Sequence, residues 1–237
     1  MRYGQPVLGI LGSVGPLVTA LLMRMVIEKT PARIDQEHIP MIVFNDPQIP
    51  DRTAHILDRS KPDSLPEMAK VARWLQEAGA DFIAIACNTA HFYCDGISAS
   101  VSIPVLNIMD ETAREVCSSA PEVRRVGLMA TEGTVASGVF ETYFARRGVS
   151  LVVPDAVDQR LLNGLIYDKV KASLPYDPEE LLNVARRLRG RRCDAVVVGC
   201  TELSVVFRDL DPAARPAWLH DSLDVLAARC VEVARGT

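Results

Sequence analysis

Short apolar runs alternate along the chain with longer segments in which apolar residues recur at helical spacing. Several runs are continuously apolar, as in parallel strands that helices cover on both faces. Strands are expected at Val7–Leu11, Met41–Phe44, Phe82–Ala86, Val105–Ile108, Val126–Met129, Leu151–Val153 and Ala195–Val198. Helices are expected at Leu17–Lys29, Ser64–Ala78, Gly138–Arg147, Leu161–Lys171, Pro178–Arg189 and from Asp221 or Ser222 to about Arg235. This alternation predicts an α/β fold with parallel sheets.

The first half of the pattern recurs in the second half. Residues 8–15 align with residues 126–133, and the cysteine-bearing segment 80–89 aligns with 192–201. So long a repeat indicates duplicated lobes, since solenoid repeats have periods of about 20–50 residues. We expect two similar lobes, each an α/β sandwich around a parallel sheet, related by a pseudo-twofold axis. The first would comprise residues 1–115 and 212–237 and carry Cys87, and the second would comprise residues 116–211 and carry Cys200.

Composition and charge exclude several classes of protein. The 237 residues are 49% hydrophobic and 24% charged, which provides ample apolar material for a core. The net charge is −4 and no basic run occurs, so nucleic acid is not an expected partner. No apolar stretch reaches the roughly 18 residues of a membrane helix, and the amino terminus lacks the features of a signal peptide. We expect a soluble, cytoplasmic protein that binds neither membrane nor nucleic acid.

The cysteines fall into two groups. No C-x-x-C pair or zinc-finger spacing occurs, so we expect reduced thiols and no metal site. Polar groups follow Cys87 and Cys200 immediately, at the ends of two apolar strands, and such groups suit the surroundings of a ligand. The other cysteines are expected to be small buried apolar residues: Cys94, Cys117, Cys193 and Cys230.

Two thiols on opposite walls of one site could invert a stereocentre. Ligands of facing α/β lobes bind at the carboxyl ends of the strands, which would place the active site between the lobes. A thiol titrates at about 8.5, so a modest downward shift gives a thiolate base at neutral pH. One cysteine would remove a proton and the other would return one to the opposite face. This design requires no cofactor, and it gives the duplication a reason.

Other residues could bind the substrate or support the cysteines. Arg52 lies in a Pro-rich loop after a strand and could clamp a carboxylate, although an ordinary surface arginine fits the sequence equally well. Amides at Ser13–Val14 and Glu132–Gly133 would face carboxylates at helix N-termini. His91, on the helix after Cys87, could be an acid/base group or could merely pack or hydrogen-bond. Glu202 could orient Cys200 or bind an ammonium group, and a carboxylate favoured at a helix start fits it equally well. The spacing of the first glycines does not fit G-x-G-x-x-G, which argues against a dinucleotide site.

Six motifs, read together and in order, resemble those of the aspartate/glutamate racemases, in particular the aspartate racemase branch. They are Gly12-x-x-Gly15-Pro16, Asn45-Asp46-Pro47 with Ile49-Pro50-Asp51-Arg52-Thr53, Ala86-Cys87-Asn88-Thr89-Ala90-His91, Ala130-Thr131-x-Gly133-Thr134, Ile166-Tyr167-x-x-Val170-Lys171 and Gly199-Cys200-Thr201-Glu202-Leu203. The resemblance runs from about residue 7 to residue 235. It implies a two-lobed amino-acid racemase that is independent of pyridoxal phosphate and usually dimeric.

The resemblance also implies roles for particular residues. Cys87 and Cys200 would be the two acid/base groups, and Arg52 and Lys171 would bind the substrate carboxylates. The remaining pocket residues would be Asn88, Thr89, Thr131, Thr134 and Thr201.

The first turn departs from the family's common Gly-Gly-Met-Gly-Pro. Here it reads Gly12-Ser13-Val14-Gly15-Pro16, so Ser13 adds a hydroxyl where the turn would approach the substrate. The reaction type is therefore better specified than the substrate, for which aspartate is expected and glutamate is the next candidate.

Three alternatives stay open at the level of sequence. Maleate isomerases and hydantoin racemases also use two cysteines, but the Arg52 loop and the Lys171 motif favour a dicarboxylic amino acid. A non-catalytic amino-acid-binding protein is a third alternative. Retention of both Cys87 and Cys200 argues against it.

Overall fold

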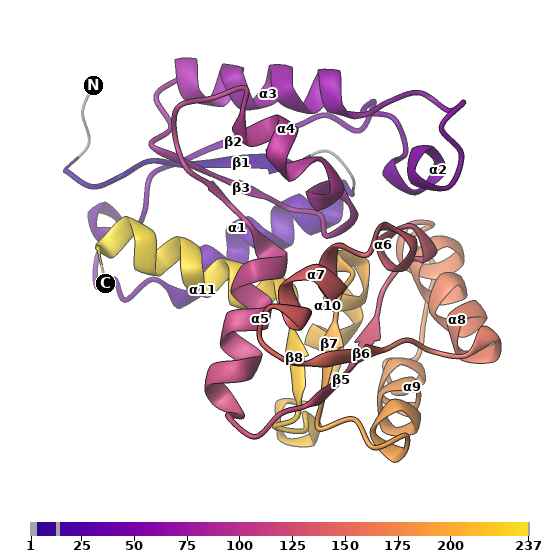
Figure 1. Ribbon diagram of the computed structural model, residues 1–237. Coiled ribbons are helices and arrows are strands. Elements are labelled where there is room, and N and C mark those ends of the chain that lie inside the picture. Colours follow the sequence, from indigo (N-terminus) through magenta and orange to yellow (C-terminus); the bar gives the residue numbers. More distant parts are fainter. Residues whose placement is uncertain (1–3, 13–14, 237) are drawn as a thin grey trace. The chain divides into compact units, whose positions relative to one another are not determined.

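The protein forms two compact units, each built on a four-stranded parallel sheet. The structure is a computed structural model that describes residues 4–12 and 15–236. Unit 1 comprises Met1–Ile108 and Leu223–Thr237, and unit 2 comprises Met109–Ser222. The strand orders, β2-β1-β3-β4 and β6-β5-β7-β8, are the same, and helices flank each sheet (Figure 1). The predicted α/β class with two similar lobes is confirmed, while the expected lobe limits near residues 115 and 211 stay a prediction.

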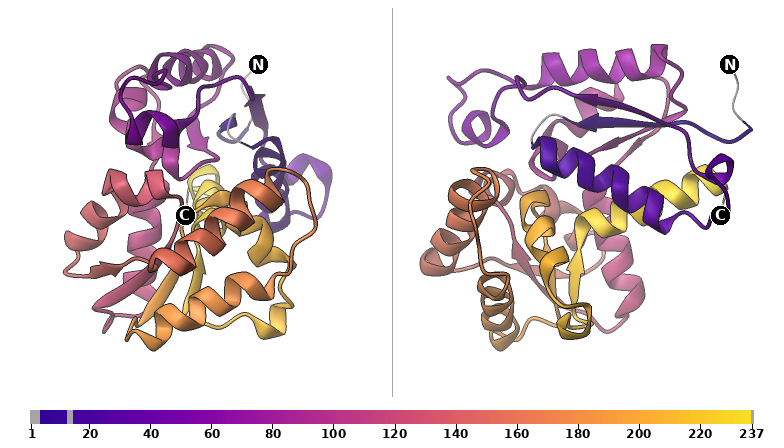
Figure 2. Two further views of the ribbon diagram at one scale, coloured as in Figure 1. Left: turned by 90° about the vertical axis from the view of Figure 1, so that its right-hand side faces the viewer. Right: turned by 180° about the vertical axis from the view of Figure 1, so that it is seen from behind.

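Unit 1 holds the first four strands of the chain. They are β1 (Leu8–Gly12), β2 (Met41–Asn45), β3 (Phe82–Ile85) and β4 (Val105–Leu106). Its helices are α1 (Pro16–Lys29), η1 (Asp35–Glu37), α2 (Arg52–Leu57), α3 (Leu65–Glu77), η2 (Thr89–Tyr93), α4 (Cys94–Ser98) and most of α11 (Ser222–Arg235). Every residue of β1 and β3 is buried, because these are the two central strands. A 2.9 Å ion pair between Lys29 and Asp224 joins α1 to α11, which run side by side (Figure 2).

Unit 2 repeats the arrangement with the next four strands. They are β5 (Arg125–Met129), β6 (Ser150–Val152), β7 (Ala195–Val198) and β8 (Leu219–Asp221). Its helices are α5 (Ile108–Ser119, from Met109 on), α6 (Glu132–Ser137), α7 (Val139–Ala145), α8 (Ala156–Asn163), the π-helix η3 (Gly164–Val170), α9 (Glu179–Gly190), α10 (Thr201–Asp209) and η4 (Pro212–Ala214). The apolar face of α9 packs on β5 and β7 and forms the core of this unit.

Several elements differ from the sequence-based expectation. The strand expected to reach Ile108 ends at Leu106, and Ile108 begins the unpredicted helix α5. Arg52 does not lie in a loop; it is the first residue of α2, whose N-terminus is capped by the Asp51 side chain accepting a hydrogen bond from the Ala54 amide at 2.7 Å. The helix expected over Leu161–Lys171 divides into the end of α8 and η3. Within the described residues, no helix has both the length and the apolar character that crossing a bilayer requires.

Candidate active site

In unit 1, Cys87 follows the carboxyl end of the central strand β3. The thiol-bearing residue is 5% exposed, and its amide donates a hydrogen bond to the Ile85 carbonyl at 2.8 Å. Asn88 and Thr89 come next, at the start of η2, and both are buried. Polar side chains and a thiol are therefore gathered at the sheet edge where α/β folds bind their ligands.

The buried ring of His91 ties Cys87 to a second strand end. Nδ1 lies 2.8 Å from the Cys87 carbonyl oxygen, while Nε2 lies 3.1 Å from the Ile108 amide nitrogen and 3.3 Å from the Leu106 carbonyl oxygen. Because an amide hydrogen can only be donated, Nε2 accepts from Ile108, and Nδ1 carries the proton given to Cys87. Burial lowers the pKa of the imidazole. His91 is thus a neutral ring that holds the Cys87 backbone.

Arg52 is buried and partly used by its own turn. Only 4% of the residue is exposed, and Nη1 donates hydrogen bonds to the carbonyl oxygens of Ile49 at 3.0 Å and Pro50 at 2.5 Å. Among the described residues, Nε has no hydrogen-bond partner. Helix α2, which Arg52 begins, contacts η2, which starts two residues after Cys87. The Arg52 guanidinium is therefore held in place, has one N–H donor without a partner among the described residues, and lies on a helix that packs against η2.

In unit 2, Cys200 occupies the corresponding place after β7. It is 3% exposed and is the residue before the first turn of α10. The preceding residue, Gly199, donates its amide hydrogen to the Met129 carbonyl at 2.8 Å. A Cβ at Gly199 would lie 2.5 Å from the Leu128 Cδ1, so no larger residue fits without movement. The approach of β5 to Gly199 fixes the backbone that carries Cys200.

Four predicted site residues form one chain of contacts in unit 2. The Cys200 Sγ donates to Glu202 Oε2 at 3.2 Å, and the Thr201 hydroxyl lies 3.5 Å from the same oxygen. The other oxygen, Oε1, lies 3.6 Å from Lys171 Nζ, which also stands 5.0 Å from the ring centre of Tyr167. Burial raises the pKa of the Cys200 thiol well above its usual range, the negative charge of Glu202 raises it further, and Lys171 lowers it in part. Cys200 is therefore held as a thiol.

Two threonines lie at the carboxyl end of the neighbouring strand β5. Thr131 caps α6 by accepting a hydrogen bond from the Thr134 amide at 3.1 Å, and the two hydroxyl oxygens are 3.0 Å apart. Both residues are buried. Because β5 and β7 are parallel neighbours, this helix start lies at the same sheet edge as Cys200. The expected position of Glu132 and Gly133 at a helix N-terminus is correct.

Two residues at this edge are absent from the sequence-based set. Ser204 Oγ lies 2.5 Å from Asp221 Oδ1 and 3.4 Å from the Cys200 carbonyl oxygen, and both side chains are buried. The signal that could have found Ser204 is its offset, since it follows Cys200 by the same interval as His91 follows Cys87. The predicted binding residue Ser13 lies outside the described residues. Within 4–12 and 15–236, no cluster of three or more His, Cys, Asp or Glu side chains could hold a metal ion.

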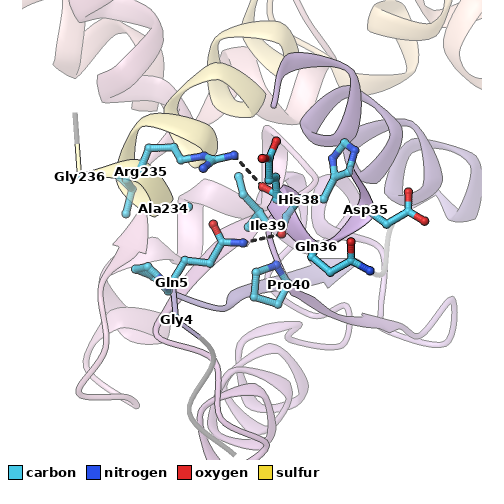
Figure 3. Close-up of a pocket in the computed structure, with 13 residues that line it drawn as sticks. Gly4, Gln5, Asp35, Gln36, His38, Ile39, Pro40, Ala234, Arg235 and Gly236 are labelled. Carbon is cyan, nitrogen blue, oxygen red and sulfur yellow. Dashed lines mark hydrogen bonds between the residues drawn. The ribbon is translucent and has the colours of Figure 1, made fainter. Parts of the chain in front are cut away.

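A cavity of about 1030 Å³ opens at the opposite edge of the unit 1 sheet (Figure 3). It is lined by residues 4–6 before β1, residues 35–40 before β2, and the end of α11. Gln5 donates to the His38 carbonyl, and Arg235 donates to the Glu37 carbonyl at 2.6 Å. Because β1, β2 and β3 are parallel, these amino ends lie away from Cys87. The cavity is separate from the candidate active site.

Comparison with known proteins gives consistent matches along most of the chain. The model of the Asp/Glu/hydantoin racemase family matches residues 11–230. The broad-specificity amino-acid racemase RacX of Bacillus subtilis is 27% identical over 208 residues, which cover 84% of this chain and 87% of that protein. A glutamate racemase of Aquifex aeolicus is 24% identical over 160 residues, 64% of this chain and 58% of that protein. The structure of Picrophilus torridus aspartate racemase superposes with a TM-score of 0.80 at 27% identity, covering 97% of this chain and 94% of that one.

Proposed function

The chain belongs to the Asp/Glu/hydantoin racemase family and is an amino-acid racemase, and we propose that it interconverts L- and D-aspartate without a cofactor by proton transfer between Cys87 and Cys200. One observation carries this proposal. Each unit has a sheet of the same strand order, and a buried cysteine follows the corresponding strand, β3 or β7, in each. Inversion at a carbon atom requires equivalent groups for its two faces, and a duplicated lobe with a duplicated cysteine meets that requirement.

The proposed reaction has two proton transfers. A thiolate sulfur of one cysteine takes the α-hydrogen of aspartate as a proton, and the electron pair of the broken C–H bond stays on the α-carbon and spreads into its carboxylate. The thiol of the other cysteine then donates its proton to the opposite face of the planar carbon. The product is the other enantiomer, the first cysteine is now a thiol, and the second is a thiolate. Turnover in the reverse direction restores the starting state.

The surroundings of Cys200 suit the donor role in this scheme. Its thiol proton is hydrogen-bonded to Glu202 at 3.2 Å, and burial beside that carboxylate raises the pKa. A thiolate formed at this position would be a strong base, because the same negative charge disfavours it. Lys171, 3.6 Å from Glu202, would limit the accumulated negative charge. Glu202 would thus act through Cys200.

Two cations support a substrate with two carboxylates. Arg52 is buried with its Nε unpaired among the described residues, and a substrate carboxylate would satisfy this donor. Lys171 supplies a second positive charge beside Glu202, and it would bind the other carboxylate of the substrate. The rest of the proposed pocket consists of polar residues that follow strands in the sequence: Ser13, Asn88, Thr89, Thr131, Thr134 and Thr201.

We further propose that the protein works as a homodimer in the cytoplasm. The dimer follows from the resemblance to aspartate racemases. The cytoplasm follows from the chemistry, because two free thiols are needed and that compartment keeps thiols reduced. Light scattering of the purified protein would test the dimer, with a mass of twice 25.9 kDa expected and a mass of 25.9 kDa contradicting it.

The reaction is tested by deuterium incorporation. Extensively dialysed protein is incubated with L-aspartate in D₂O without pyridoxal phosphate, and the product is resolved by chiral chromatography and mass spectrometry. We expect D-aspartate carrying deuterium at the α-carbon. Parallel incubations with glutamate, alanine, maleate and a hydantoin test the substrate class. Unlabelled, unchanged aspartate together with turnover of any of these would refute the assignment of the substrate, and no turnover of any would favour a binding protein.

A further inference from the structure

Asp221 is a buried carboxyl group that the proposed proton transfers do not use. It is 4% exposed and lies at the end of β8. Its Oδ1 is 2.5 Å from the hydroxyl oxygen of Ser204, which is itself fully buried. So short an O–H···O contact is typical of a hydroxyl that donates to a carboxylate. The two side chains form one strongly coupled hydrogen-bonded pair.

This pair joins two segments that carry Cys200. Asp221 is the register partner of Val198, the last residue of β7, from which only Gly199 separates Cys200. Ser204 lies in the first turn of α10; its amide donates to the Cys200 carbonyl at 3.1 Å, and its hydroxyl oxygen lies 3.4 Å from the same carbonyl oxygen. The Ser204–Asp221 contact therefore fastens the turn that bears Cys200 to the neighbouring strand.

Unit 1 has the same fastening, made by different chemical groups. His91 follows Cys87 by the interval at which Ser204 follows Cys200, and its ring links the Cys87 carbonyl to the Ile108 amide just after β4. Strand β4 takes the place in its sheet that β8 takes in the other. An imidazole has nitrogen atoms on two sides and spans the distance alone. The shorter Ser204 side chain cannot span from the Cys200 turn to the backbone of β8, and the Asp221 side chain on β8 completes the connection.

A purely structural purpose does not account for a carboxyl group at this position. Removing a carboxylate from water is costly, and a well-packed apolar residue would often give equal or greater stability. What an apolar residue cannot give is a directional bond between the end of β8 and the Cys200 turn. Proton transfer depends on such direction, since an error of about 1 Å in a reacting group can cost on the order of 100-fold in rate.

We infer that Ser204 and Asp221 act together as positioning residues for Cys200, in the role that His91 has for Cys87. The inference rests on the proposed racemisation by two cysteines. Because Ser204 and Asp221 would support only Cys200, a change in either residue should slow proton transfer by Cys200 and leave proton transfer by Cys87 unchanged.

The first experiment compares Ser204→Ala, Asp221→Asn and the double variant with Ser222→Ala. Ser222 is a matched control, because it is a buried hydroxyl at the same strand end and donates to the Val198 carbonyl at 2.8 Å. For each single variant of the pair, we expect kcat to fall by about 10- to 100-fold and KM to change by less than about threefold. The double variant should be no slower than the slower single variant, since the pair acts as one unit. Independent, multiplicative losses, or an equal loss of kcat in Ser222→Ala, would overturn the inference.

The second experiment separates positioning from general damage. Ser204→Ala is introduced into Cys87→Ser, where only Cys200 can exchange the α-hydrogen, and into Cys200→Ser, where only Cys87 can. Deuterium exchange should fall at least about 10-fold in the first background and stay within about twofold in the second. Equal decreases of the exchange rate in both backgrounds would refute the positioning role but would leave the proposed racemisation intact. Wild-type racemisation that persists in both cysteine variants would instead refute the proposed function, and the inference with it.

Discussion

Glu202 accepts the thiol hydrogen bond of Cys200 at 3.2 Å through one carboxylate oxygen and lies 3.6 Å from Lys171 through the other. The corresponding support in unit 1 is different, because the neutral ring of His91 binds the Cys87 carbonyl and not its sulfur. The two units therefore share a strand order, but different side chains hold the segments that carry their cysteines. This asymmetry gives predictions that treat each half of the protein separately.

Replacing Glu202 by Gln should lower the pKa of the Cys200 thiol. The carboxylate charge and its hydrogen bond both raise that pKa, so after the change burial would be the one remaining contribution that raises it, while Lys171 would still lower it. Alkylation of Cys200 by iodoacetamide, followed at several pH values by peptide mass spectrometry, should become faster at neutral pH. Cys87 in the same sample provides the reference. Unchanged or slower alkylation of Cys200 would show that Glu202 does not control its protonation.

Replacing Lys171 by Met should raise the pKa of the Cys200 thiol, the opposite of the change expected for Glu202→Gln. The apolar stem beside Tyr167 is kept, but the positive charge that lowers the pKa of Cys200 is lost. Truncating one partner of such a charge pair costs about 2 kcal/mol or more, so kcat/KM for aspartate should fall by at least roughly 30-fold. The control is Lys169→Met. Lys169 lies two residues before Lys171, and its replacement removes a 2.6 Å ion pair with Glu180. Equal losses in the two variants would contradict a specific role for Lys171.

Replacing Arg52 by Lys should weaken the binding of dicarboxylic substrates. The guanidinium already serves the carbonyl oxygens of Ile49 and Pro50, and an ammonium group cannot hold that turn and a carboxylate with the same planar geometry. Hydrogen bonds to charged groups contribute about 1.5–3 kcal/mol, so KM for aspartate should rise by roughly 10-fold or more. The exposed Arg59, changed to Lys, is the control. A wild-type KM in Arg52→Lys would remove Arg52 from the substrate site.

His91 should make folding stability dependent on pH. Burial lowers the pKa of the folded-state imidazole below the value of 6.5, so below that pH the unfolded chain binds a proton that the folded protein does not. The free energy of unfolding should therefore decrease as pH falls through about 6.5, and urea titrations at about pH 7.5 and about pH 5.5 would measure it. His91→Gln should lose part of this slope, while His220, whose pKa burial also lowers, would retain the remainder. An identical slope in wild type and His91→Gln would contradict the prediction.

At neutral pH, His91→Gln should also lower the free energy of unfolding by about 1–3 kcal/mol, because Gln cannot satisfy both the Cys87 carbonyl and the Ile108 amide.

The sequence predicts the central strands well and the short polar elements poorly. Strands β1, β3 and β7 are fully buried, so their residues form continuous apolar runs that stand out from the surroundings. Strand β8 consists of Leu219, His220 and Asp221, and a three-residue run with two polar side chains carries no strand periodicity. The start of helix α5 is hard to recognise in the sequence because Ile108 extends the apolar run of β4, although backbone pairing ends at Leu106.

In the candidate site, sequence motifs identify residues that are adjacent to the cysteines in the sequence. Cys200, Thr201 and Glu202 are adjacent in sequence, and their contacts could be expected from the motif. The Ser204–Asp221 contact joins residues on different elements and depends on the register of β7 with β8, which the sequence does not specify. The helical position of Arg52 depends on capping by Asp51, and in the sequence this signal is surrounded by prolines that are typical of a loop.

We propose that Cys87 and Cys200 serve opposite faces of one α-carbon. Replacing either cysteine by Ser leaves a hydroxyl that cannot act as a base near neutral pH, so that face loses proton abstraction. The other thiolate can still remove the α-proton and return a deuteron from solvent to the same face. Cys94→Ser, a change at another buried thiol, is the control and should racemise normally.

The most direct measurement is α-deuterium exchange of L- and D-aspartate in D₂O by Cys87→Ser and Cys200→Ser, with enantiomers separated before mass analysis. The prediction is that both variants lose racemisation and that each keeps residual exchange of a different enantiomer. Exchange of the same enantiomer by both variants, or racemisation at the wild-type rate by either, would contradict it.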